Sequence, residues 1–109
     1  MISWQDFEKI EMRCGTVIDV NDFPNARKSA YQLTIDFGEF GIKRSSAQIT
    51  HHYSKKDLLN KQVIAVVNFS VKQIANFFSE CLVLGVYDEQ NNVVLLQPER
   101  KVTNGMKVG

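Results

Sequence analysis

With 109 residues, 44% of them hydrophobic and 23% charged, the chain is long enough for one soluble domain with a single core and too short for two. Thirteen basic and twelve acidic residues give a formal net charge of +1, which is weaker than the bias typical of a dedicated nucleic-acid binder. No apolar run approaches a membrane span and no signal-peptide pattern opens the chain, so we expect a cytoplasmic protein without membrane insertion.

The charges are nevertheless segregated along the chain. The start, Met1–Asp22, is acidic, the middle, Phe23–Lys61, is moderately basic, and the remainder is balanced. A basic middle attracts phosphates or acidic peptides by long-range steering. A solvated basic face explains the same pattern without a ligand.

The first expected element is a short N-terminal helix. Ser3 followed by Asp6 resembles a capping box in which aspartate replaces the usual glutamate. Trp4 and Phe7 then recur at helical spacing, so one face of the helix is apolar. That face must be buried, either on the rest of the domain or on a partner.

Alternation of apolar and polar residues predicts three strands in the first half of the chain: Met12–Val20, Tyr31–Phe37 and Ile42–Ser46. In the first of them, a strict period of two places Cys14 and Ile18 on the same face. A loop at Phe23–Ala26 and a turn framed by Gly38 and Gly41 separate the three strands.

Two continuous apolar segments, Val63–Val67 and Leu82–Tyr87, predict buried strands in the second half. Ahead of them, Gln48–Leu59 has apolar residues at the spacing of one or two helical turns. A polar turn at Asp88–Asn92 precedes a last strand at Val93–Leu96. Five or six short strands with one helical insertion predict a small closed barrel. An insertion between the third and fourth strands favours an oligonucleotide/oligosaccharide-binding (OB) barrel, with a small β-sandwich as the competing fold.

The stretch Asn68–Gly85 is the candidate recognition surface. It mixes amides, a hydroxyl and a carboxylate with apolar side chains, and it contains no obvious catalytic group. Phe77 and Phe78 are adjacent, and adjacent strand residues face opposite ways, so we expect one in the core and one exposed. An exposed phenylalanine beside a groove can hold an apolar peptide side chain or stack on a base.

The titratable residues do not form a recognisable catalytic or metal pattern. His51 and His52 lack metal-ligand spacing, and no Ser-His-Asp set, carboxylate pair or phosphate loop accompanies them. Cys14 and Cys81 lie far apart inside apolar strand patterns, which favours reduced core thiols over a disulfide. We therefore predict a protein that is not an enzyme and that needs neither a metal nor another cofactor.

Five sequence blocks cover nearly the whole chain: DFEKIEMRCGTVIDVNDFPNAR, LTIDFGEFGIKRSSAQIT, LNKQVIAVVNF, SECLVLG and VVLLQPERKVTNGMKVG. In this order they resemble the stand-alone tRNA-binding domain family, which includes the C-terminal appendix of methionyl-tRNA synthetases. Within that family the chain looks most like the CsaA-type branch of export-related chaperones. The resemblance implies one domain over residues 1–109, an all-β OB-fold five-stranded barrel with a short N-terminal helix and a helical insertion between strands 3 and 4. It also implies a homodimer, with Trp4 and Phe7 at an interface that includes the C-terminal segment.

The resemblance further implies a binding surface. The family motif appears as Asn68 and Phe69 and, further on, as the segment Ser79–Leu82. Val71 replaces the family's proline, and only Lys72 remains of two usual basic residues. The candidate peptide- or tRNA-binding residues are Lys43, Arg44, Ser46, Gln48, Asn68, Lys72, Phe78, Ser79 and Glu80.

Structural roles compete with ligand contact at several of these positions. The Asn68 amide, at the end of a strand, can satisfy backbone groups instead of a ligand. Ser79 and Glu80 can cap and anchor the loop, and Glu80 would repel a phosphate. Strand alternation puts Lys43 and Arg44 on opposite faces, so the two cations cannot both line one groove unless the strand bulges.

Two functions compete at this stage. The resemblance implies a cytoplasmic homodimeric chaperone that binds unfolded or export-bound polypeptides in an OB-fold groove and assists secretion, with precursor polypeptides and the export machinery as partners. The apolar loop with its polar rim and low basicity favours this function. The alternative is a structure-specific tRNA-binding protein in which Lys43, Arg44 and Lys72 contact phosphates.

Overall fold

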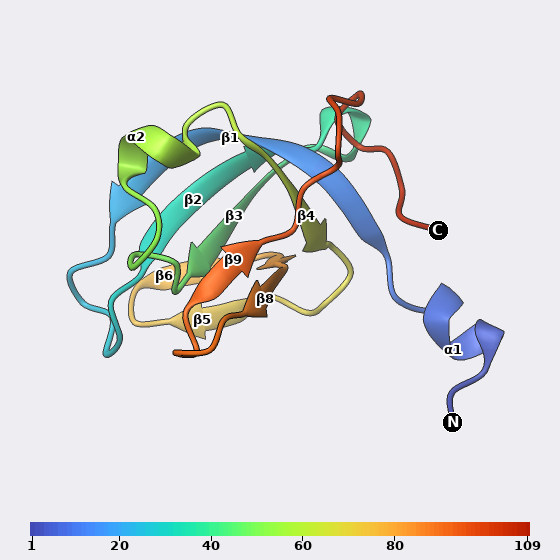
Figure 1. Cartoon of the computed structure of the whole chain (residues 1–109), viewed down its shortest axis with the longest axis horizontal. Helices are drawn as coiled ribbons and strands as arrows, with labels where there is room; N and C mark the ends of the chain where they lie inside the picture. The colour runs from blue at the N-terminus through green and yellow to red at the C-terminus, as the bar shows by residue number, and fades with distance from the viewer.

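The computed structural model describes residues 1–109, and short β-strands dominate it (Figure 1). In chain order the elements are α1 (Trp4–Glu8), β1 (Met12–Asp22), β2 (Tyr31–Asp36), the 3-10 helix η1 (Gly38–Phe40), β3 (Ile42–Ala47), α2 (Lys55–Leu58), β4 (Gln62–Val66), β5 (Lys72–Ile74), β6 (Phe77–Ser79), β7 (Leu82–Val83), β8 (Gly85–Tyr87) and β9 (Val93–Leu95).

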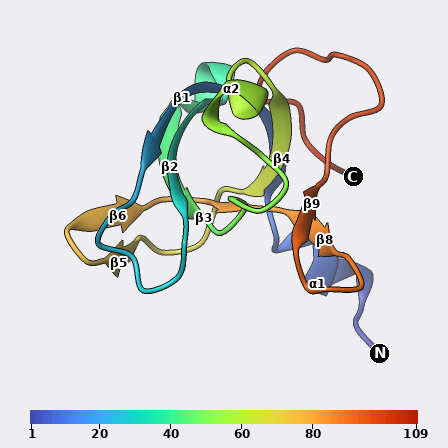
Figure 2. The same ribbon diagram turned by 60° about the vertical axis from the view of Figure 1, so that its left-hand side comes forward.

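Five antiparallel strands form one curved sheet in the order β3-β2-β1-β4-β7. The long β1 is central and pairs with β2 on one side and β4 on the other. The sheet curls until β3 contacts β6 and β7, and Figure 2 shows the resulting ring of strands. The predicted OB-type barrel is confirmed, with α1 ahead of it and α2 inserted between β3 and β4.

The barrel closes through the end of β6 and the residues that follow it. The Glu80 N–H donates to the Arg44 carbonyl at 2.7 Å, and the Arg44 N–H donates to the Glu80 carboxylate at 3.0 Å. The hydroxyl of Ser79 accepts from the Ser46 N–H at 3.2 Å. Buried Ser45 donates from its hydroxyl to the Cys81 carbonyl at 2.9 Å. Ser79 and Glu80 therefore act as structural anchors, which is one of the two roles that the sequence left open.

The barrel core follows from the alternation in β2. Leu33, Ile35 and Phe37 are fully buried, and Leu58 of α2 packs into the same cluster. Gly15 of β1 faces them, and a Cβ there would lie 2.7 Å from the side chains of both Ile35 and Phe37. Only glycine fits this close approach of β1 to β2.

The strict alternation predicted for β1 is wrong beyond its midpoint. Its register with β2 shifts between Val17 and Asp19, so the strand contains a bulge. A bulge reverses the faces of the residues that follow. Gly15 and Val17 face the core before the bulge, Ile18 at the bulge is 42% exposed, and Val20 packs against the core after it.

The prediction of one buried strand at Leu82–Tyr87 is also wrong. The segment forms two short strands, β7 and β8, in different sheets. Leu82, Val86 and Tyr87 are 48%, 54% and 74% exposed. The Leu84 N–H still donates to the Ile64 carbonyl of β4, and the chain leaves the barrel at Gly85, which pairs with β9 so closely that a Cβ there would lie 2.4 Å from Val93.

The stretch Asn68–Gly85, predicted as the recognition surface, contains the β5–β6 hairpin. Phe77 of this hairpin is 2% exposed and packs with Phe23 and Ala30 in a small second cluster. The Phe23 and Phe77 ring centroids lie 5.3 Å apart. Phe78 is 55% exposed, which confirms that one phenylalanine is buried and the other is not. In the predicted helical stretch 48–59, only α2 is helical.

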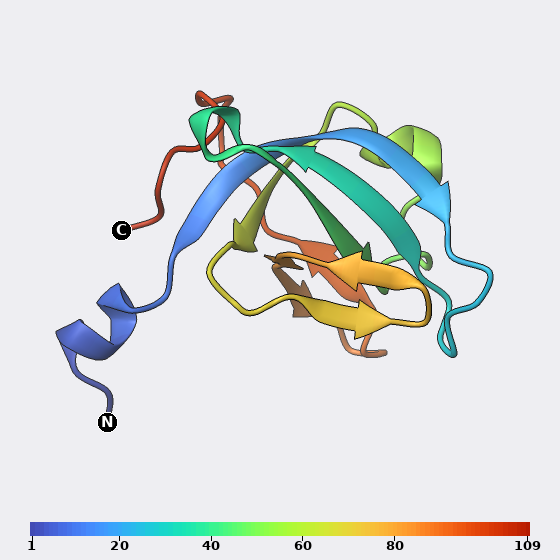
Figure 3. The same ribbon diagram turned by 180° about the vertical axis from the view of Figure 1, so that it is seen from behind.

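Helix α1 begins with the predicted capping box between Ser3 and Asp6, and it lies away from the barrel (Figures 1 and 3). None of its residues is buried, and Trp4 is 84% exposed. The helix therefore does not bury its apolar face on its own barrel. The C-terminal segment does pack there, because Gly105 and Met106 exchange backbone hydrogen bonds with Cys14 at 2.7 and 2.9 Å.

Candidate functional site

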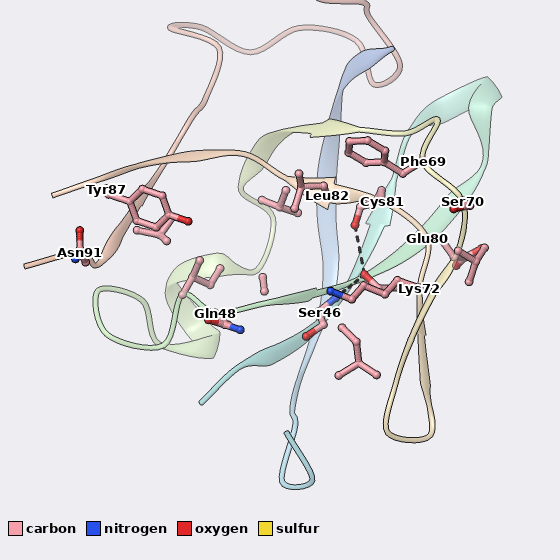
Figure 4. Close-up of a pocket in the computed structure, with 17 residues that line it drawn as sticks. Ser46, Gln48, Phe69, Ser70, Lys72, Glu80, Cys81, Leu82, Tyr87 and Asn91 are labelled. Carbon is pink, nitrogen blue, oxygen red and sulfur yellow. Dashed lines mark hydrogen bonds between the residues drawn. The ribbon is translucent and has the colours of Figure 1, made fainter. Parts of the chain in front are cut away.

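A groove with a volume of about 700 Å³ lies beside the barrel (Figure 4). Residues 46–49 at the end of β3, the segment leading into β5, residues 79–83, and the β8–β9 hairpin surround it. Ten of its seventeen lining residues are hydrophobic. We call this feature the groove.

Exposed apolar side chains form the walls of the groove. Phe69 and Val71 precede β5, and each is 57% exposed. Leu82 and Tyr87 come from β7 and β8 and are similarly accessible. Folding normally buries large apolar side chains in the core. Several of them exposed together in a concave surface are therefore typical of a binding site.

Polar groups form the rest of the lining. Lys72 is the one basic residue of the groove and Glu80 the one acidic residue. Five of the nine predicted site residues lie here: Ser46, Gln48, Lys72, Ser79 and Glu80. Their contact with a ligand stays a prediction, and the hydroxyl of Ser79 and the carboxylate of Glu80 already hold β3 in place.

The other predicted residues lie outside the groove. Asn68 connects α1 to the end of β4, since its amide accepts from the Glu11 N–H at 3.0 Å and donates to the Lys9 carbonyl at 2.7 Å. The Arg44 guanidinium lies 4.4 Å from the centroid of the Phe77 ring. Lys43 and Phe78 are also absent from the groove lining.

Sequence reasoning missed the walls of the groove. Leu82 and Tyr87 were absent from the candidate residues because they belong to a strand-like apolar run, which indicates a core, and Val71 was considered only as the replacement for the family's proline. The available signal was the position of all three within or next to the polar stretch, where apolar residues can line one cleft.

The two thiols are shielded from solvent. Burial raises the pKa of Cys81, which lines the groove, to about 12, and burial also raises the pKa of Cys14. A raised pKa keeps a thiol protonated and unreactive near neutral pH. No disulfide joins the two residues.

We therefore expect neither thiol of the folded protein to react with Ellman's reagent at mildly alkaline pH. Both should react once guanidinium unfolds the chain. The measurement is the absorbance of released thionitrobenzoate over time. Rapid release from the native protein would show that a thiol is accessible and would contradict the structure.

A histidine–carboxylate pair lies next to the groove. His52 Nε2 is 2.7 Å from Asp88 Oδ2, which joins the loop before α2 to the β8–β9 turn. Hydrogen bonds from the Asn92 N–H and then from His52 lower the pKa of Asp88.

No group of three His, Cys, Asp or Glu side chains comes together as a metal site. Neither helix is long and apolar enough to cross a membrane.

Comparison with known proteins now identifies the family. The family model described as "Putative tRNA binding domain" matches residues 12–107. The chain belongs to this tRNA-binding domain family. Among curated relatives, methionine–tRNA ligase of Thermococcus onnurineus (strain NA1) is 34% identical over 98% of the chain. The chain spans only 14% of the length of that ligase.

Solved structures superpose over the entire chain. CsaA chaperone of Bacillus anthracis str. Ames is 49% identical with a TM-score of 0.95, and the alignment covers 100% of this chain and 99% of that one. CsaA chaperone protein of Picrophilus torridus is 51% identical with a TM-score of 0.94, and both chains are covered completely. A MetRS-related protein of Pyrococcus horikoshii, 23% identical with a TM-score of 0.89, shares the fold.

Proposed function

We propose that the protein is a cytoplasmic, homodimeric chaperone that binds unfolded or export-bound polypeptides in the groove and thereby assists secretion. The observation that carries the proposal is the groove itself, with apolar walls and a single cation. Extended polypeptides offer apolar side chains that such walls can cover. The likeness over the full chain to two CsaA chaperones supports the same function.

The direct test is suppression of aggregation. A chemically unfolded client is diluted into buffer with and without the protein, and light scattering is followed. We expect scattering to fall as the protein approaches the molar concentration of the client, because bound segments are withheld from self-association. Unchanged scattering at a molar excess of protein would refute the chaperone function.

The proposed homodimer is supported by the apolar surface around α1. Trp4 and Ile2 are 84% and 75% exposed. A second cavity of about 450 Å³, lined by Met12, Leu84 and Met106 among others, lies where the chain leaves α1 and where the C-terminal segment returns. Burial of such side chains between two copies removes apolar area from water.

We expect Trp4→Ser to shift the dimer toward monomer at micromolar concentration, because the indole loses its contact with the partner. Sedimentation velocity measures the shift. Ile42→Ser is the matched control, since Ile42 is 60% exposed and lies far along the chain from α1. An unchanged dimer in the Trp4 variant would place the interface elsewhere, and a wild-type monomer would refute the dimer.

A second candidate function is structure-specific binding of tRNA. The description of the family and the methionine–tRNA ligase relatives favour it. Lys43, Arg44 and Lys72 would supply phosphate contacts, and none of the three forms an ion pair within the chain. Affinity should then fall steeply with salt, and charge reversal at any of them should weaken binding to all tRNAs alike.

A further inference from the structure

We propose that the client segment binds as an added β-strand along the open edge of β5, with alternate side chains directed into the groove. This inference rests on the proposed function, since it specifies how a polypeptide occupies the groove. It names the ligand class as an extended segment whose apolar residues alternate with others. Pairing through the backbone would let one groove accept many sequences.

The edge of β5 is open. β5 pairs with β6 alone, and β6 lies between β5 and the barrel (Figure 3). No backbone hydrogen bond outside the regular elements involves residues 68–78. The approach to β5 and its outer side therefore carry backbone groups without partners in the chain, which is the usual template for pairing with another strand.

The hairpin register identifies which groups point outward. A two-residue turn, Ala75-Asn76, joins the strands, so the flanking pair Ile74–Phe77 is hydrogen-bonded. The next pair, Gln73–Phe78, is then not hydrogen-bonded, because the two kinds of pair alternate along an antiparallel ladder. The N–H and C=O of Gln73 consequently face the open edge.

The side chains of the hairpin alternate in the same way. Lys72 and Ile74 line the groove, and so does Ser79, the cross-strand partner of Lys72. Gln73 and Phe78 share the opposite face and are absent from the lining. A strand added beside β5 continues this sheet, so every second client residue faces the side on which Phe69 and Val71 are exposed.

The edge is only partly protected against pairing, because β5 is three residues long and carries one lysine. Lys72 is the only charged residue of β5, and the strand contains no proline. Charged side chains and prolines are the common means of blocking edge strands. Exposed Phe69 and Val71 precede the edge instead, and they increase the apolar area that an added strand can cover.

The test uses two variants at Gln73. Gln73→Pro removes the outward N–H while leaving the ladder with β6 intact, because proline is tolerated where the N–H faces away from the sheet. Gln73→Ala keeps the N–H. Both variants lose the same bond from the Gln73 side chain to the Ala75 carbonyl, so they form a matched pair. The probe is a fluorescein-labelled peptide of about ten residues that alternates leucine and serine, and thermal melts check the fold of each variant.

We expect Gln73→Pro to weaken binding about three- to tenfold, which corresponds to the loss of one hydrogen bond, and Gln73→Ala to bind like the parent protein. Two further peptides carry N-methyl groups on every second backbone nitrogen, starting at adjacent positions. The peptide whose methylated nitrogens face β5 should bind more weakly, and the other should bind like the unmodified peptide. Equal binding by both Gln73 variants, together with equal binding of the two N-methylated peptides, would overturn strand addition while leaving the proposed function standing. Failure of the unmodified peptide to bind the parent protein would overturn both.

Discussion

Leu82→Asp is expected to weaken binding of an extended apolar peptide by about tenfold or more while leaving the barrel folded. Leu82 is 48% exposed on the groove wall, so a carboxylate there stays hydrated in the free protein. In the complex the same carboxylate would lose water without gaining a partner, and the apolar contact of leucine would be lost as well. Fluorescence anisotropy with a labelled peptide measures the change.

Ile42→Asp is the control for this substitution. Ile42 is an exposed branched residue, 60% accessible, at the other end of β3 and outside the groove. The Ile42→Asp variant should bind peptide like the parent protein. Equal affinity in the parent protein and both variants would show that the groove does not hold the peptide, provided that thermal melts show both variants folded.

Phe77→Ala is expected to destabilise the protein by about 3 to 5 kcal/mol, which is typical of removing a buried phenylalanine. The ring is 2% exposed, lies 5.3 Å from the Phe23 ring, and has the Arg44 guanidinium 4.4 Å from its centroid. Its removal also frees the β5–β6 hairpin from the loop at 23–30. Urea unfolding followed by circular dichroism measures the free energy of unfolding.

The neighbouring residue supplies the matched control. Phe78 is 55% exposed on the opposite face of the same strand, so Phe78→Ala should cost less than about 0.5 kcal/mol. Similar losses in the two variants would show that the faces of β6 are assigned incorrectly. A stable Phe77→Ala protein with full peptide affinity would show that the hairpin needs no such anchor.

The barrel was predictable where the sequence pattern has one meaning. The alternation in Tyr31–Phe37 indicates a half-buried strand, and Leu33 and Ile35 of β2, together with Phe37 directly after it, are buried as expected. The capping box at Ser3 likewise predicted where α1 begins. The bulge at Val17 was not predictable, since one inserted residue changes the face of those that follow without altering composition.

The site was predicted less completely than the fold because apolar residues have two uses. Leu82 and Tyr87 appear in a run that resembles a core strand, whereas the structure exposes them on the groove. Whether such a residue packs inside or forms a binding wall depends on where the chain leaves the barrel, which a local pattern does not encode. The polar residues raised the same problem, because Asn68 and Glu80 bond to distant backbone groups.

The central claim, that the groove binds polypeptide in preference to RNA, is tested most directly by fluorescence anisotropy. A labelled extended peptide and a labelled tRNA are each titrated with the protein at low and at near-physiological salt. We expect peptide binding to survive the change in salt, because apolar contacts and backbone hydrogen bonds supply it, while binding of tRNA fades as counterions compete. Tight tRNA binding at physiological salt together with no peptide signal would contradict the account and assign the protein to RNA recognition.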